Sequence, residues 1–227
     1  MDGGPGGIVK SAAKVRDALA RLPGVYKVPA EGIELFLLRD FLDAAECRAL
    51  IRLIDADREP SALLADDPDP EFRTSESCNM DPRDPTVRAI ERKIAGTIAV
   101  DPACGETIQG QRYAVGQQFK PHHDFFFTSE PYWPAQEANG GQRTWTAMMF
   151  LNAVEEGGHT VFPTAKVRIR PRPGNLLVWN NLDEAGAPNM ASLHQGAPVV
   201  AGVKYVITKW YRERPWLPGL NRTAPSR

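Results

Sequence analysis

The stretch RYAVGQQFKPHHDFF, residues 112–126, places two of the chain's four histidines side by side and an aspartate directly after them. This β-type run predicts a strand, and successive side chains of a strand point to opposite faces. His122 and Asp124 therefore point the same way, whereas His123 points the other way. A metal site on this strand would use His122 and Asp124, and its third ligand must come from elsewhere in the chain.

The segments after residue 107 indicate the fold class. They are short β-type runs separated by glycine, proline and other turn residues, and they include TWTAMMFLN, NLLVWNN and VKYVITKWYRE. Many short strands with this punctuation favour an antiparallel sandwich or barrel over alternating βαβ units. We therefore predict a mainly β protein of the α+β class.

Helices are predicted upstream of these strands. Residues 32–42 predict a strand, and Asp43 and Glu46 then form a capping-box pattern at the start of a helix. Asp84 followed by Pro85 marks the start of a second helix. Because both helices precede the sheet, we expect them to lie on its outside.

The two ends of the chain are predicted to be peripheral. Residues 1–10 are rich in glycine, and residues 11–22 have the composition of a short surface helix. We predict a flexible or helical N-terminal extension over 1–30, a single domain over 31–216 and a C-terminal tail over 217–227. The β core of that domain is expected at about 107–212.

Composition argues against several function classes. Lysine and arginine number 27 against 28 aspartates and glutamates in 227 residues, so no global basic field would attract nucleic acid or an anionic membrane. No apolar run reaches the roughly 20 residues that cross a bilayer, and the first residues lack a secretory-signal pattern. We expect a cytoplasmic protein, monomer or homodimer. The three cysteines lack metal-ligand spacing, which predicts free thiols.

His159 and His194 are the remaining candidates for the third ligand. Two imidazoles and one carboxylate would form the facial triad that suits non-haem Fe(II) and leaves positions open for a cosubstrate and oxygen. His194 is favoured because Lys204 follows it by ten residues on a predicted barrel strand. A lysine that points into a barrel requires an anionic ligand or an acidic partner.

At this point the sequence resembles the Fe(II)/2-oxoglutarate-dependent dioxygenases, and within them the prolyl 4-hydroxylase-like group. The resemblance covers about residues 33–216 and agrees in motif order and spacing. It implies a double-stranded β-helix, or jelly roll, with N-terminal supporting helices. The segments that carry it are FRTSESCNM, RYAVGQQFKPHHDFF, GGQRTWTAMMFLN, EEGGHTVFP, PRPGNLLVWNNL and LHQGAPVVAGVKYVITKWYRERPW.

The resemblance also implies roles for individual residues. His122, Asp124 and His194 match the iron ligands, and Lys204 matches the salt-bridge partner of the distal carboxylate of 2-oxoglutarate. The cosubstrate pocket would also contain Tyr113 and Thr160, and the substrate side Arg143, Trp210 and Phe119. The implied cofactors are Fe(II), 2-oxoglutarate, O2 and ascorbate, and the implied reaction hydroxylates a C–H bond and releases succinate and CO2.

Two departures from the family pattern leave the substrate open. Phe119 stands where enzymes that act on peptidyl proline carry a tyrosine, and His159 stands where a small or acidic residue is usual. A prolyl residue in a peptide or protein is the leading substrate, and a free amino acid or other small molecule is the alternative. A catalytically silent metal-binding or sensing module is a third hypothesis. A zinc hydrolase is remote, because no HExxH helix is present.

The segment 128–142, between two predicted strands, is the longest predicted loop of the β region. Long loops in compact domains are often functional. We expect it to form a lid over the substrate, with Gly140 and Gly141 as its hinge.

Overall fold

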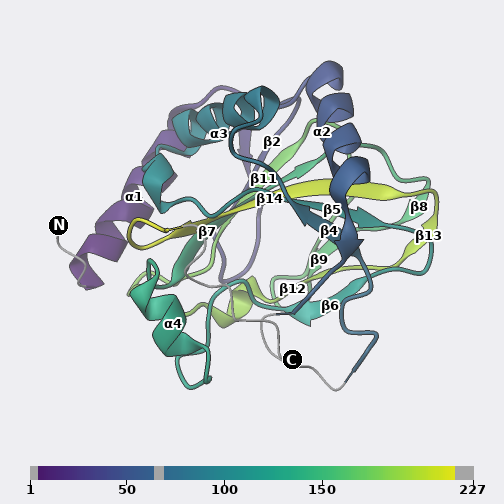
Figure 1. Ribbon diagram of the computed structural model, residues 1–227. Coiled ribbons are helices and arrows are strands. Elements are labelled where there is room, and N and C mark those ends of the chain that lie inside the picture. Colours follow the sequence, from purple (N-terminus) through teal and green to yellow (C-terminus); the bar gives the residue numbers. More distant parts are fainter. Residues whose placement is uncertain (1–4, 64–68, 218–227) are drawn as a thin grey trace.

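An eight-stranded antiparallel sheet forms the larger layer of the protein. The computed structural model describes residues 5–63 and 69–217, and Figure 1 shows its elements. The longest strands, β7 and β14, lie side by side in the middle of this sheet. The strand order is β1 (Val25–Lys27), β2 (Leu35–Leu38), β11 (Leu176–Asn180), β7 (Arg143–Phe150), β14 (Lys204–Arg212), β5 (Gln109–Tyr113), β4 (Glu76–Asn79), β3 (Glu59–Pro60).

A four-stranded sheet forms the second layer. Its order is β10 (Val167–Ile169), β9 (Thr160–Phe162), β12 (His194–Gly196), β6 (Phe119–His122), and β8 (Glu156–Gly157) pairs separately with β13 (Val199–Ala201). Phe150, Trp179 and Val206 of the larger sheet pack with Phe162 of the smaller one in a single buried cluster. This arrangement is consistent with the predicted jelly roll, and the site described below lies between the two layers.

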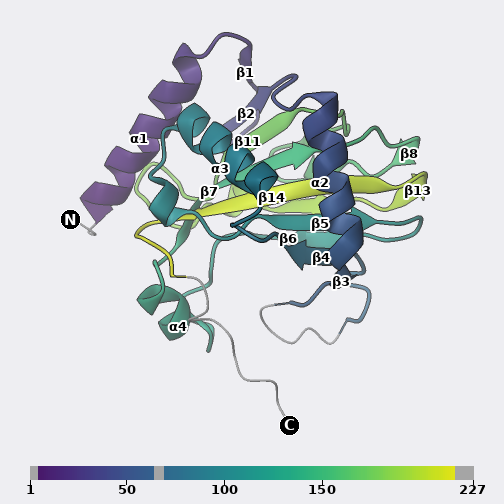
Figure 2. The ribbon, with the colours of Figure 1, turned by 45° about the horizontal axis from the view of Figure 1, so that its top comes forward.

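Three helices, α1 (Pro5–Arg21), α2 (Ala44–Asp57) and α3 (Pro85–Ile98), cover the outer face of the eight-stranded sheet (Figures 1 and 2). The predicted helix starts are confirmed. At the start of α2, the Asp43 side chain accepts hydrogen bonds from Ala45 N and Glu46 N, and the Glu46 side chain accepts one from Asp43 N. At the start of α3, Asp84 is the cap and Pro85 lies in the first turn. Apolar side chains of α2 and α3 pack with Trp145 of the sheet in the second buried cluster.

The N-terminal helix differs from its prediction as a short surface helix over 11–22. It runs from Pro5 to Arg21, and Val15 and Leu19, four residues apart on one helical face, are at most 1% exposed. Both belong to the buried cluster beneath α2 and α3. This segment therefore packs on the sheet through one apolar face. The domain limits at residues 30 and 217 stay a prediction, and residues 1–4 and 218–227 lie outside the described residues.

The cysteines and the shorter helices complete the fold. Cys47, Cys78 and Cys104 are free and buried, which confirms the prediction of free thiols. No helix in the described part of the chain is long and apolar enough to cross a membrane. Beyond the strands and the three covering helices, the described residues also form a short helix, α4 (Trp133–Ala138), and two single 3-10 turns, Pro102–Cys104 and Met190–Ser192.

Candidate active site

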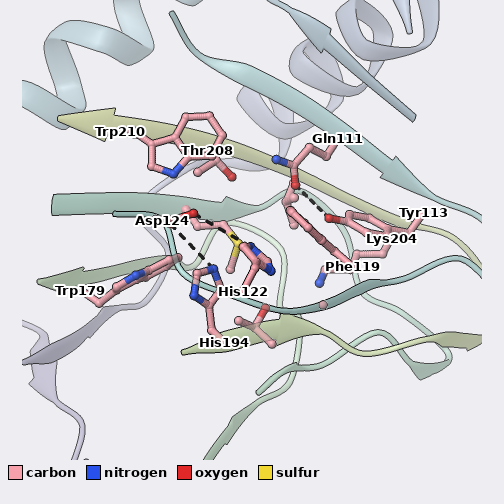
Figure 3. A pocket seen from close by; sticks show the side chains of 14 residues that line it. Gln111, Tyr113, Phe119, His122, Asp124, Trp179, His194, Lys204, Thr208 and Trp210 are labelled. Atoms are coloured by element: carbon pink, nitrogen blue, oxygen red, sulfur yellow. Dashed lines mark hydrogen bonds and ion pairs between the residues drawn. The ribbon is translucent and has the colours of Figure 1, made fainter. Parts of the chain in front are cut away.

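The three predicted metal ligands lie together in one pocket between the sheets (Figure 3). β6 and β12 are neighbours, and their register places His122 opposite His194. His122 Nε2 lies 4.0 Å from Asp124 Oδ1, and His194 Nε2 lies 3.8 Å from Asp124 Oδ2. One ligand atom from each residue lies within 4.8 Å of the other two. Two histidines from adjacent strands and the aspartate that follows β6 therefore converge on one point.

Backbone carbonyls fix both imidazoles. His122 Nδ1 lies 2.8 Å from Lys120 O, and His194 Nδ1 lies 3.0 Å from Ser192 O. Because a carbonyl oxygen only accepts, each Nδ1 carries the proton and each Nε2 keeps its lone pair for a metal. Burial lowers the pKa of His122 to about 3, and the neighbouring His194 adds to this effect. The His122 imidazole is therefore neutral near pH 7.

Asp124 is placed by a hydrogen bond, since β6 ends at His122 and strand alternation does not extend to residue 124. Thr146 Oγ1 donates to Asp124 Oδ2 at 2.7 Å. Burial alone would raise the pKa of Asp124, but His194, His122, Arg143 and this hydrogen bond together lower it. The carboxylate is therefore ionised and available as a ligand.

His123 lies outside this cluster, as the alternation predicts. Its ring centroid is 4.5 Å from that of Phe125, and its Nε2 is 3.3 Å from Met190 O. His159 is also outside the cluster, with Nδ1 at 3.2 Å from an Arg168 guanidinium nitrogen. Among the described residues, only His122, Asp124 and His194 form a group that could hold a metal ion.

Comparisons with known proteins identify the family of this chain. A family model described as the 2OG-Fe(II) oxygenase superfamily matches residues 108–212. Probable prolyl 4-hydroxylase 6 of Arabidopsis thaliana is 33% identical over 203 residues, which cover 79% of this chain and 69% of that protein. The chain belongs to the prolyl 4-hydroxylase family of 2-oxoglutarate- and Fe(II)-dependent oxygenases. Probable prolyl 4-hydroxylase 10 of the same plant is 32% identical, with 66% of its length covered, so the chain spans about two thirds of these relatives.

A solved structure extends the likeness to three dimensions. The viral collagen prolyl hydroxylase of Paramecium Bursaria Chlorella virus-1, in complex with 2-oxoglutarate, matches with a TM-score of 0.61 at 26% identity. The match covers 78% of this chain and 94% of that one. It confirms the jelly-roll fold, and with the family match it identifies the protein as a dioxygenase that uses Fe(II) and 2-oxoglutarate.

The cosubstrate side of the pocket fits a dianionic acid. Lys204 is 2% exposed and has no ion-pair partner in the described part of the chain. Burial lowers its pKa to about 7. Tyr113, whose ring centroid is 5.1 Å from Lys204 Nζ, and Thr160, whose buried hydroxyl has no hydrogen-bond partner among the described residues, line the same pocket. An unpaired buried ammonium beside an unsatisfied hydroxyl is the donor set that a carboxylate would complete.

These observations decide how the family's cofactors fit. The two Nε2 atoms and the Asp124 carboxylate are the donors that suit Fe(II). Lys204, with Tyr113 and Thr160 in the same pocket, would hold the distal carboxylate of 2-oxoglutarate. The sequence did not single out two further residues of this pocket, Gln111, which accepts from Tyr113 Oη at 3.0 Å, and Thr208 (Figure 3). Strand alternation could have found both, because Gln111 lies two residues before Tyr113 on β5 and Thr208 lies four residues after Lys204 on β14.

Arg143 lies in a buried ion pair, where the sequence predicted a residue facing the substrate. Its Nε and one terminal nitrogen lie 2.6 and 2.7 Å from the two oxygens of Glu106, which is 8% exposed. Arg212 Nε contacts the same carboxylate at 2.6 Å. The Arg143 guanidinium also lies 4.2 Å from the ring centroid of Trp210, which lines the pocket. Arg143 therefore supports the pocket wall through Trp210. No pattern in the sequence pointed to Glu106 as its partner.

Phe119 is a pocket residue, as predicted, and it stacks on a metal ligand. Its ring lies 3.5 Å from the His122 ring, centroid to centroid, at 12° between the planes. The Arg73 guanidinium lies 4.7 Å from the Phe119 ring centroid. Phe119 thus presents an apolar ring where a tyrosine would add a hydroxyl, and it restricts the rotation of His122.

The segment 128–142 is more structured than the predicted loop. It contains α4, and residues of the C-terminal part of the chain hold it. Arg212 donates to Gln136 Oε1 at 2.6 Å, and Asn139 and Leu217 exchange two hydrogen bonds. Gly140 and Gly141 have φ angles of 94° and 77°, a backbone conformation that favours glycine. Closure of this segment over a substrate stays a prediction.

Proposed function

We propose that this protein hydroxylates a prolyl residue in a peptide or protein. The observation that carries the proposal is one pocket that holds a His-Asp-His triad together with Lys204, which is buried and forms no ion pair with any described residue. Relatives named prolyl 4-hydroxylases, and a viral collagen prolyl hydroxylase of similar structure, support the choice of substrate.

Each residue has a distinct part in this reaction. When bound, Fe(II), 2-oxoglutarate and O2 supply the oxidation that converts a C–H bond to C–OH and releases succinate and CO2. His122, Asp124 and His194 hold the metal, and Lys204 orients the cosubstrate by its distal carboxylate. The aromatic rings of Trp179 and Trp210 line the pocket and limit the access of water.

Phe119 favours a second candidate, the hydroxylation of a free amino acid or another small molecule. A tyrosine at this position would offer a hydrogen bond to a peptide, and the stacked phenyl ring cannot. The loss of such a contact in a buried site is worth about 1–3 kcal/mol. The pocket wall is thus less suited to a peptide backbone than a tyrosine wall would be.

Succinate production separates these candidates. The protein should be incubated with Fe(II), 2-oxoglutarate and O2, together with proline-rich peptides in one series and free amino acids in another. Stimulation by peptides supports the leading proposal, and stimulation by free amino acids alone supports the second. The His122→Ala variant is the inactive control. Absence of succinate with every substrate would refute both and favour a silent metal-binding module.

Three further expectations accompany the proposal. Ascorbate should sustain turnover over many cycles, which a time course with and without it tests. The protein should act in the cytoplasm, which fractionation of its host cells tests. Monomer and homodimer both remain compatible with a surface of balanced charge, and sedimentation at several protein concentrations distinguishes them.

A further inference from the structure

Two buried side chains form a hydrogen-bonded relay that ends on the Asp124 carboxylate. Asn181 Nδ2 lies 2.9 Å from Thr146 Oγ1, and Thr146 Oγ1 lies 2.7 Å from Asp124 Oδ2. Thr146 and Asn181 are 0% exposed and Asp124 is 5% exposed. Water is therefore excluded from the relay, and each group depends on the next.

The chemistry of these groups gives the relay a direction. The Asn181 Nδ2 group only donates, so Thr146 Oγ1 accepts from it. The threonine hydroxyl has a single proton, which must then go to Asp124. With the amide reversed, Asn181 Oδ1 and Asp124 Oδ2 would compete for that one proton. The observed orientation commits it to the carboxylate.

Backbone hydrogen bonds fix the position of Asn181 beside β7. Asn181 N donates to Thr144 O at 2.8 Å, and Asn181 O accepts from Asn189 N at 2.9 Å. The preceding residue, Asn180, is the last of β11 and pairs with Trp145 of β7. The amide therefore has one fixed origin, directly beside the strand that carries Thr146.

The relay is not explained by stability alone. Asn181 Oδ1 is buried and has no hydrogen-bond partner among the described residues. An unsatisfied buried acceptor is unfavourable, and a leucine of similar shape would avoid it. The Asn181 amide thus makes one side-chain hydrogen bond, to Thr146, and Thr146 in turn contacts the predicted metal ligand Asp124.

We propose that Asn181 is a positioning residue for the metal centre, which acts through Thr146 on Asp124. The hydroxyl of Thr146 fixes the orientation of the carboxylate through Oδ2. Oδ1, which accepts no hydrogen bond from the described residues, would be the freer oxygen for a metal. This inference rests on the metal site of the proposed function and adds Thr146 and Asn181 to it.

The test measures binding of Co(II) to the full metal-free chain, by visible absorption and tryptophan fluorescence. Thr146→Val should raise the Kd for Co(II) about tenfold or more, as the loss of an outer hydrogen bond to a ligand does. Asn181→Leu should raise it in the same direction by a smaller factor. Because Asn181 acts only through Thr146, the double variant should bind Co(II) no more weakly than Thr146→Val alone.

Thr144→Val is the matched control, because Thr144 is a buried threonine on the same strand that donates to Tyr211 O at 3.1 Å. It should bind Co(II) like the unaltered protein. Urea unfolding of every variant separates metal affinity from stability, and Asn181→Ala replaces Asn181→Leu if the latter does not fold. Unchanged Co(II) affinity in the Asn181 variants, or additive effects in the double variant, would overturn the inference. Failure of the unaltered protein to bind Co(II) would instead refute the metal site and the proposed function.

Discussion

Replacing Lys204 by methionine should stabilise the protein in the absence of cosubstrate. Lys204 is 2% exposed, and no carboxylate in the described part of the chain pairs with it. Methionine has a similar length and no charge to bury. The lysine thus weakens the fold, and in the proposed function its ammonium would bind the anionic cosubstrate.

The magnitude follows from the pKa. Burial lowers the pKa of Lys204 from 10.5 to about 7, and at 1.36 kcal/mol per pH unit this is a cost of about 5 kcal/mol. Between pH 7 and pH 10.5 the unfolded chain binds more protons than the folded protein, so the free energy of unfolding rises with pH. Below pH 7 both states are protonated and the folded protein carries the full cost. About 5 kcal/mol is therefore the largest gain expected from Lys204→Met at pH 6.

Urea unfolding at pH 6 and pH 9, without metal or 2-oxoglutarate, measures this effect. Lys204→Met should unfold at higher urea than the unaltered protein at pH 6, and the difference should be smaller at pH 9. Lys209→Met is the matched control: Lys209 is also buried on β14, but it pairs with Glu91 at 2.6 Å, so its loss should destabilise.

Cosubstrate binding gives a second measurement on the same two proteins. With Fe(II) replaced by Mn(II), saturating 2-oxoglutarate should stabilise the unaltered protein by about 2.7 kcal/mol at one hundred times its Kd. It should leave Lys204→Met nearly unchanged. Destabilisation of Lys204→Met at pH 6, or an effect independent of pH, would refute the argument that the lysine is held as an uncompensated cation.

Three other substitutions test the site and the fold. His122→Ala should abolish Mn(II) binding measured by calorimetry, whereas His123→Ala should retain it because this ring lies outside the cluster; equal losses would contradict the ligand assignment. Phe119→Tyr should lower the KM for proline-rich peptides several-fold in a succinate assay, since it restores a donor to the wall, and an unchanged KM would separate this ring from the substrate. Asp84→Ala should lower the free energy of unfolding by about 1 kcal/mol through loss of the α3 cap, and unaltered urea unfolding would show the cap to be dispensable.

Local sequence patterns predicted the parts of the protein that depend on near neighbours. Asp43 with Glu46, and Asp84 with Pro85, mark helix starts because the capping groups lie within one turn of each other. The exclusion of His123 from the metal site also follows from neighbouring residues, although Asp124 is held by Thr146 and not by strand alternation.

The N-terminal helix shows where composition misleads. Alanine, lysine and arginine around Val15 and Leu19 suggested a surface helix, yet the two apolar residues share one face. Whether such a narrow stripe is buried depends on the surface available to cover it. The outer face of the eight-stranded sheet and α3 provide that surface. No local sequence pattern could reveal it.

The sequence by itself determined the chemistry of this protein: the types of metal ligand, their chain order, the lysine ten residues after His194 and the strand-rich fold. Only the tertiary structure decided how the ligands are held. Glu106 reaches Arg143 across 37 residues, and Asn181 reaches Thr146 across 35. The physical reason is that hydrogen bonds and ion pairs act over about 3 Å in space, whereas sequence periodicity constrains only residues within a few positions.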